Sequence, residues 1–170
     1  VRVDRYLVDD GQPELGIKLR GGREGVEIKG LVDAATDALA AAPFAGPIEI
    51  WSKWWTATLD VDANRTEAIE KQRWVRAFDT TGATPVDATS LVPQWIGGLL
   101  AMPARGCNVE VVRIMTSNGR VWWSLGFEAY GAVATVAADV TIAARTMASR
   151  QPPELHGAVC QSYPVWLTSQ

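Results

Sequence analysis

Short segments in which apolar and polar positions are interleaved, with frequent bulky β-forming residues, occur throughout the chain. Such segments are typical of β-strands, and the glycine, proline, asparagine and aspartate residues between them favour turns. Seven segments have this pattern: residues 1–8, 15–20, 25–29, 48–56, 73–78, 108–115 and 121–129. Ser117, Asn118 and Gly119 between the last two are typical of a hairpin turn. The chain is therefore expected to be rich in antiparallel β-structure.

Helical patterns are fewer. An alanine-rich segment at 32–42, a short charged segment at 65–72 and a long segment of good helix formers at 132–149 each favour a helix. Residues 83–105, interrupted by proline and glycine, are expected to form a connection with one helical turn. No internal repeat, low-complexity tail or block of like charge divides the chain, so residues 1–170 are expected to form one α+β domain. This order of elements favours a closed or strongly curved sheet with helices outside it.

Charged side chains are expected to share faces of this sheet, because residues two apart in a strand point to the same side. The sets with a common face are Lys18 with Arg20, Glu27 with Lys29, Glu49 with Lys53, Lys71 with Arg73, Trp74 with Arg76, and Trp122 with Ser124 and Glu128. The apolar alternates then face the helices. They are Ile17, Leu19, Val26, Ile28, Ile48 and Ile50.

Two interpretations of the charged face follow from the pattern. In the first, the face is solvated and its cross-strand ion pairs are each worth well under about 1 kcal/mol. In the second, the sheet closes into a barrel. Its lumen then holds Lys and Arg side chains that bind phosphate oxygens, interleaved with carboxylates that bind divalent cations. The residues leave both interpretations open.

The overall composition is that of a soluble globular protein. The chain has 170 residues, of which 48% are hydrophobic, and no apolar stretch reaches the length of a membrane helix. Its net charge of -3 gives no general attraction to a nucleic acid polymer, so an anion site must come from local clustering. The chain lacks a secretory signal, which favours the cytoplasm, and the two cysteines, Cys107 and Cys160, are expected to be free thiols. Because it opens in a predicted strand at Val1 without a Met, it is expected to be a fragment or a processed form.

Other catalytic patterns are weak. His156 is the only histidine, so no Ser/His/Asp set and no His-rich metal site is predicted, and there is no phosphate-binding loop of the GxxxxGK[ST] type. Eight tryptophans are many for this length. About half are expected in the core, and Trp51, Trp55 and Trp122 could stack on a planar ligand if they face inward.

The order of several short motifs resembles a known family. RVDRYL, LGIKLRGG and VEIKG, followed later by NVEVVRIM, WWSLGFEAYG, a long helical segment and SYPVWL, are similar to the successive motifs of CYTH domains, the triphosphate tunnel proteins. The resemblance implies an antiparallel tunnel of eight strands that binds triphosphate or another phosphorylated small molecule. It also implies phosphoanhydride hydrolysis with Mg²⁺ or Mn²⁺.

The resemblance assigns roles to matching residues. Lys18 and Arg20 match the basic pair that grips phosphates, and Lys29 matches the lysine of the following strand. Glu110 and Glu128 match the late carboxylates that hold the metal and serve catalysis. The remaining substrate-binding candidates are Arg73 or Arg76, at a later basic position, and Lys53.

Two departures from the family pattern leave the activity open. The family's opening strand has no counterpart before Val1, which leaves seven strands, and Gly126 stands where the first late carboxylate is expected. Fewer carboxylates mean weaker metal binding. The alternatives are therefore a metal-dependent triphosphatase, a non-catalytic binding module for an anionic organic ligand, and a partner-binding barrel with an inert lumen.

Overall fold

The computed structural model describes residues 1–8, 12–34, 38–82, 84–88, 95–96, 99–100 and 103–169. Its main element is an eight-stranded antiparallel sheet in the order β12-β11-β7-β1-β2-β3-β6, with β8 paired to β7. The strands are β1 (Arg2–Leu7), β2 (Leu15–Leu19), β3 (Val26–Ala34), β6 (Glu49–Thr56), β7 (Thr66–Asp79), β8 (Val86–Asp87), β11 (Gly106–Met115) and β12 (Val121–Tyr130).

The other elements are small. Two two-stranded sheets pair β4 (Leu39–Ala41) with β5 (Phe44–Gly46) and β9 (Trp95–Ile96) with β10 (Leu99–Leu100). The helices are α1 (Val133–Ala148) and α2 (Tyr163–Thr168), with a single 3-10 turn at Ala63–Arg65. No helix in the described part of the chain is long and apolar enough to cross a membrane.

Strand register divides the side chains of the sheet between two faces, because directly paired residues point to the same side. Tyr6 pairs with Lys18, Lys18 with Glu27, and Lys29 with Lys53. The same face continues over β7, β11 and β12, and we call it the inner face. Its other members include Asp4, Ile69, Lys71, Arg73, Glu110, Val112, Ile114, Trp122, Ser124 and Glu128.

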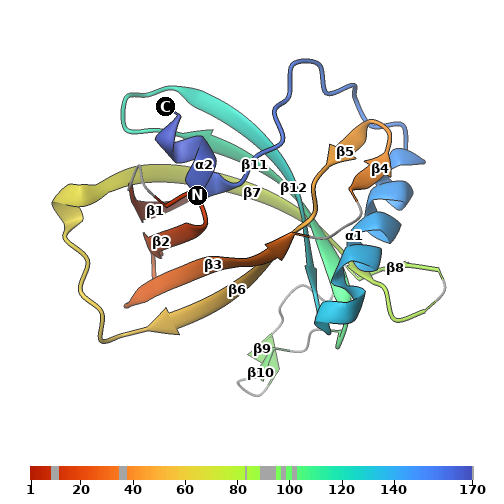
Figure 1. Ribbon diagram of the computed structural model, residues 1–170, viewed down its shortest axis with the longest axis horizontal. Coiled ribbons are helices and arrows are strands. Elements are labelled where there is room, and N and C mark those ends of the chain that lie inside the picture. Colours follow the sequence, from red (N-terminus) through yellow and green to blue (C-terminus); the bar gives the residue numbers. More distant parts are fainter. Residues whose placement is uncertain are drawn as a thin grey trace.

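The sheet is strongly curved, and Figure 1 shows β3 and β6 lying across from the long strands β7, β11 and β12. An ion pair of 3.2 Å joins Lys29 Nζ on β3 to Glu128 Oε1 on β12, although these strands are not neighbours in the sheet. Among the described residues, β12 and β6 at the two ends of the sheet are not paired with each other. The curvature therefore brings inner-face side chains from distant strands into contact.

The helix α1 covers the outer face of β11 and β12. Its Val140 and Ala143 pack on Phe78, Cys107 and Val109 in one apolar cluster. The buried Asp139 of the same helix receives two hydrogen bonds from Arg105 Nε, of 2.8 and 2.9 Å. The predicted helix at 132–149 is thus confirmed, and small alanines let it approach the sheet closely.

The helix α2 packs on the inner face instead, against a second apolar cluster of Tyr6, Ile69, Val112, Ile114 and Leu167. This position corrects the expectation that all helices lie outside the sheet. Aromatic packing holds α2 on this face, because the Tyr163 ring stacks on Tyr6 and the Trp166 ring packs edge-on against Trp122. In Figure 1, α2 lies beside β1 and far from α1.

Two predicted helices are wrong. Residues 65–72 belong largely to β7, where Thr66 to Lys71 pair with β1 along its whole length, so strand pairing overrides local helix propensity. Residues 32–42 contain the end of β3, which continues through an irregularity between Leu31 and Asp33, and then β4. Residues 35–37, and residues 83, 89–94, 97–98 and 101–102 of the predicted connection at 83–105, lie outside the described residues. The predicted β11–β12 hairpin and the free state of both cysteines are confirmed.

A close backbone approach at Gly21 gives a test of the fold. Its N–H donates to the buried Asp4 Oδ1 at 3.1 Å, and a Cβ there would lie 2.1 Å from the Val3 carbonyl oxygen. We expect Gly21→Ala to lower the free energy of unfolding by about 1 to 3 kcal/mol in urea denaturation. Gly126→Ala is the matched control, because a Cβ there meets no described atom within 4 Å. Equal stability of the two variants would contradict this account.

Candidate functional site

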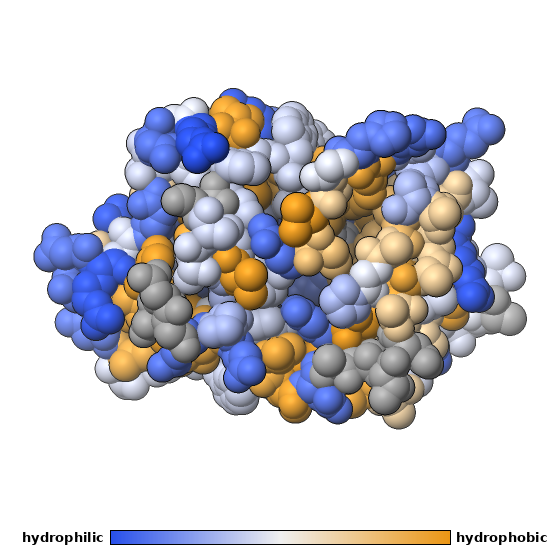
Figure 2. Space-filling view, turned by 45° about the horizontal axis from the view of Figure 1, so that its top comes forward, coloured by the Kyte–Doolittle hydropathy of each residue, from blue (hydrophilic) through white to orange (hydrophobic). Residues whose placement is uncertain are grey.

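The inner face carries all four lysines of the chain, Lys18, Lys29, Lys53 and Lys71. The arginines are spread over both faces and the loops, and Arg20 and Arg73 join the lysines on this side. Figure 2 shows a hollow near the middle of the surface, where blue hydrophilic residues adjoin orange hydrophobic ones. The concentration of amines on one face distinguishes it from the rest of the sheet.

Glu27 lies at the centre of one group of these cations. Its side chain is only 2% exposed, and Lys18 Nζ lies 2.8 Å from Oε1. Lys53 Nζ lies 3.1 Å and Arg20 Nη1 lies 3.7 Å from Oε2. Neither oxygen has a hydrogen bond of regular angular geometry, so charge attraction rather than directed bonding holds the group together. We call Glu27, Lys18, Arg20 and Lys53 the Glu27 cluster.

Charge is unbalanced within the Glu27 cluster. Burial alone would raise the pKa of Glu27, but Lys18 and Lys53 outweigh this effect and lower it to about 2, so the carboxylate is ionised at neutral pH. Burial lowers the pKa of Lys18, an effect that Glu27 opposes. Three cationic side chains therefore surround one negative charge. Lys53, whose side chain is 47% exposed, can direct its remaining N–H groups toward a ligand.

The two candidate metal ligands lie on the same face. Glu110 pairs in register with Gly126, so Glu128, two residues farther along β12, is its diagonal neighbour. Each is already in an ion pair, Glu110 with Arg73 and Glu128 with Lys29. Burial alone would raise the pKa of Glu128, but Lys29, Lys53 and Arg73 hold it below its usual value. Among the described residues no group of three or more Asp, Glu, His or Cys side chains is arranged to hold a metal ion.

Lys71 occupies the apolar part of the inner face beneath α2. Its side chain is about 7% exposed, and Nζ donates a 2.6 Å hydrogen bond to Tyr6 Oη. The same nitrogen lies 3.6 Å from the centre of the Tyr163 ring. Burial lowers the pKa of Lys71 to about 7. The positive charges of Lys18, Arg2 and Arg73 also lower this pKa, whereas the negative charge of Asp4 raises it. Burial also raises the pKa of Tyr6, so its hydroxyl stays protonated.

The structure places most of the sequence-predicted site residues together. Seven of the eight lie on the inner face: Lys18, Arg20, Lys29, Lys53, Arg73, Glu110 and Glu128. The exception is Arg76, which lies on the outer face and pairs with Asp87 at 2.9 Å. It stands three positions after Arg73, and an odd spacing in a strand reverses the direction of the side chain. Its assignment as a lumen contact is therefore corrected.

Sequence reasoning missed Lys71, Tyr6 and Tyr163 as parts of the site. The parity of β7 places Lys71 with Arg73, but the burial of Lys71 depends on α2, whose position has no local signal in the sequence. Of the three tryptophans considered for stacking, Trp55 is 46% exposed and adjoins Glu27 in register. Trp122 is not free to stack on a ligand, because its ring packs against Trp166 at the apolar cluster beneath α2. His156 is exposed beside Glu154.

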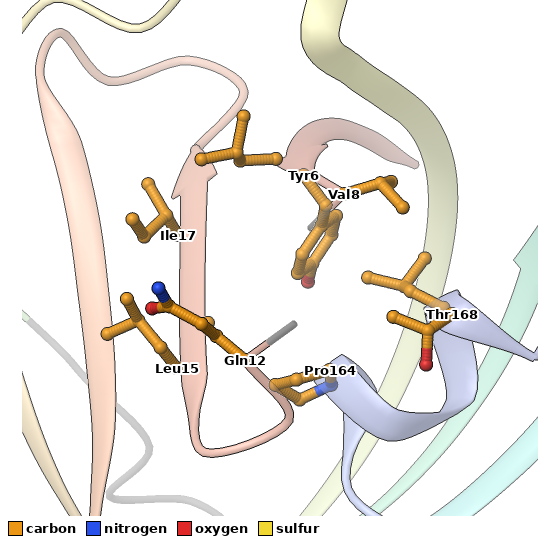
Figure 3. Close-up of a pocket in the computed structure, with 10 residues that line it drawn as sticks. Tyr6, Val8, Gln12, Leu15, Ile17, Pro164 and Thr168 are labelled. Carbon is orange, nitrogen blue, oxygen red and sulfur yellow. The ribbon is translucent and has the colours of Figure 1, made fainter. Parts of the chain in front are cut away.

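A small recess lies at the edge of α2, between this helix and residues of β1 and β2. Figure 3 shows Tyr6, Val8, Pro164 and Thr168 around it, with Gln12, Leu15 and Ile17 on the other side. Its volume of about 20 Å³ leaves room for little more than one water molecule. The charged face, and not this recess, is therefore the candidate site.

No family model, no curated protein and no solved structure matches this chain. The similarity to CYTH domains thus rests on the short motifs alone and stays a prediction.

The buried Lys71 makes stability depend on pH. Its pKa is about 7 in the folded chain and 10.5 in the unfolded chain, so unfolding takes up a proton between these values. The free energy of unfolding should therefore rise with pH, by about 2 to 3 kcal/mol between pH 7 and 9.5. Urea denaturation at several pH values measures this slope. Lys71→Met should flatten it and Lys53→Met should retain it. A flat profile for the unmodified protein would contradict the burial of the amine.

Proposed function

We propose that the inner face binds a phosphorylated small molecule or an inorganic polyphosphate through the Glu27 cluster. The observation that carries the proposal is the buried Glu27 carboxylate held among Lys18, Arg20 and Lys53. Phosphate oxygens are bound by such convergent Lys and Arg side chains, which satisfy several oxygens at once. The proposal includes a tunnel-like enclosure of the site by the curved sheet.

The burial of Glu27 favours this function over a plain solvated face. Exposed ion pairs keep most of their hydration and contribute little to stability, whereas a buried carboxylate must be balanced by nearby cations. Here the cations exceed what one carboxylate requires. Glu27 keeps their side chains converged in the absence of a ligand, so less conformational entropy is lost when an anion binds. These preformed cations are sufficient for a non-catalytic binding module for an anionic organic ligand.

Metal-dependent phosphoanhydride hydrolysis is the second candidate. The diagonal placement of Glu110 and Glu128 on one face supports it, because two carboxylates and the oxygens of a bound phosphate suit a hard cation such as Mg²⁺ or Mn²⁺. The metal would neutralise charge on the phosphate. Binding it would require Glu110 and Glu128 to release Arg73 and Lys29, whose freed charges could then contact the phosphate.

Calorimetric titration with tripolyphosphate tests the binding proposal. We expect Lys18→Met and Lys53→Met each to weaken binding about tenfold, because each removes a charge-assisted hydrogen bond. Arg76→Gln is the matched control, since this arginine lies on the outer face, and it should leave the affinity unchanged. The proposal fails if all three variants bind like the unmodified protein, or if the unmodified protein does not bind.

Phosphate release separates the two candidates. With tripolyphosphate as substrate, hydrolysis should need Mg²⁺ or Mn²⁺, and Glu128→Gln should lower the rate at least about tenfold, the typical loss for a displaced charged contact. The same variant should retain tripolyphosphate binding, since Glu128 does not belong to the Glu27 cluster. Tight binding without metal-dependent release would assign a binding module and reject hydrolysis.

A further inference from the structure

Lys71 is an enclosed amine that does not belong to the Glu27 cluster, and the proposed binding of phosphate does not require it. Its nitrogen lies between two tyrosine rings, 3.6 Å from the Tyr163 centroid and 4.7 Å from the Tyr6 centroid. Within the described chain, Lys71 forms no ion pair with a carboxylate at 4.0 Å or less. A methionine would fill the same space without removing an ammonium from water. Packing alone therefore does not explain a lysine here.

The surroundings of Lys71 favour a neutral, nucleophilic amine. Charged and titratable groups act on it from four elements: Arg2, Asp4 and Tyr6 on β1, Lys18 on β2, Arg73 on β7 and Tyr163 on α2. Positive charges predominate among them. Desolvation and neighbouring cations both disfavour protonation of a lysine, and the neutral form attacks carbonyl carbons.

The amine also lies next to the anion site. The Tyr6 ring has Lys71 Nζ at 4.7 Å and Lys18 Nζ, a member of the Glu27 cluster, at 5.5 Å from its centroid. Arg73 is two residues from Lys71 on the same face of β7. A small molecule whose phosphate contacts Lys18 or Arg73 can thus extend its other end toward Lys71.

We propose that Lys71 forms an imine with the carbonyl group of a phosphorylated aldehyde or ketone bound on the inner face. Nζ adds to the carbonyl carbon, its two protons leave with the carbonyl oxygen as water, and a C=N bond replaces the C=O bond. The step needs no oxidant or reductant and is reversed by water. This inference rests on the proposed function and specifies its ligand class. Because the Tyr163 ring lies over one side of the amine, the proposal requires this ring to move aside when a carbonyl compound binds.

Labelling with pyridoxal 5′-phosphate, an aldehyde with one phosphate, tests the proposal. The intact protein is treated at pH 7, the imine is fixed with borohydride, and the modified lysines are identified by peptide mass spectrometry. The chain has only four lysines, so each site is resolved. Labelling at Lys71 should precede labelling at Lys53, although Lys53 is 47% exposed and Lys71 only 7%. An order that follows exposure, with Lys53 first, overturns the proposal.

Three variants and one competitor sharpen the result. Lys71→Arg should lose the first adduct and Arg76→Gln, on the outer face, should keep it. Tyr163→Ala should label faster because the ring no longer covers the amine. Where Lys71→Arg does not fold, the order of labelling in the unmodified protein decides alone. Tripolyphosphate protection separates the two proposals. Protection of Lys18 and Lys53 without any adduct at Lys71 keeps the binding site and rejects the imine, whereas no protection at any lysine rejects the binding site itself.

Discussion

The balance of charge around the buried Glu27 carboxylate is the interaction on which the inner face depends. Its partners come from β2, from the residue after β2 and from β6, so one carboxylate links both neighbours of β3. Removal of an ion from water is unfavourable unless opposite charges replace the lost hydration. The strands must therefore bring cations to Glu27. Because they bring more than one, the Glu27 cluster holds three cationic side chains around one carboxylate.

The two helices divide the sheet into regions with different tasks. The helix α1 covers the outer face of β11 and β12 with small apolar side chains, and the Arg105–Asp139 contact anchors it. The helix α2 covers only part of the inner face, where Tyr6, Ile69 and Ile114 are apolar. The charged residues of β2, β3 and β6 lie beyond α2. The sheet thus has its hydrophobic support on both faces and keeps one charged region accessible.

Strand parity explains both the successes and the failures of prediction from the sequence. Lys18 could be assigned to one face with Arg20, and Glu27 to one face with Lys29, because a period of two needs only local spacing. Only the pairing of β2 with β3 places Lys18 and Glu27 on the same side. Parity left Arg73 and Arg76 as alternatives, and only the pairing of β7 with β11 decides between them. The short charged segment at 65–72 favours a helix on local pattern, whereas pairing with β1 makes it a strand. The position of α2 depends on ring packing between distant segments, which no local pattern contains.

The distribution of lysine and arginine suggests why the inner face needs both. Arginine keeps its charge at any physiological pH, so Arg20 and Arg73 provide fixed positive charge. A lysine amine can lose its proton when it is desolvated, and Lys71 is the most buried of the four lysines. An arginine at that position would remain charged between two tyrosine rings. Fixed guanidinium charge beside an amine whose pKa is lowered by burial is the combination that the proposed imine with an anionic carbonyl compound would use.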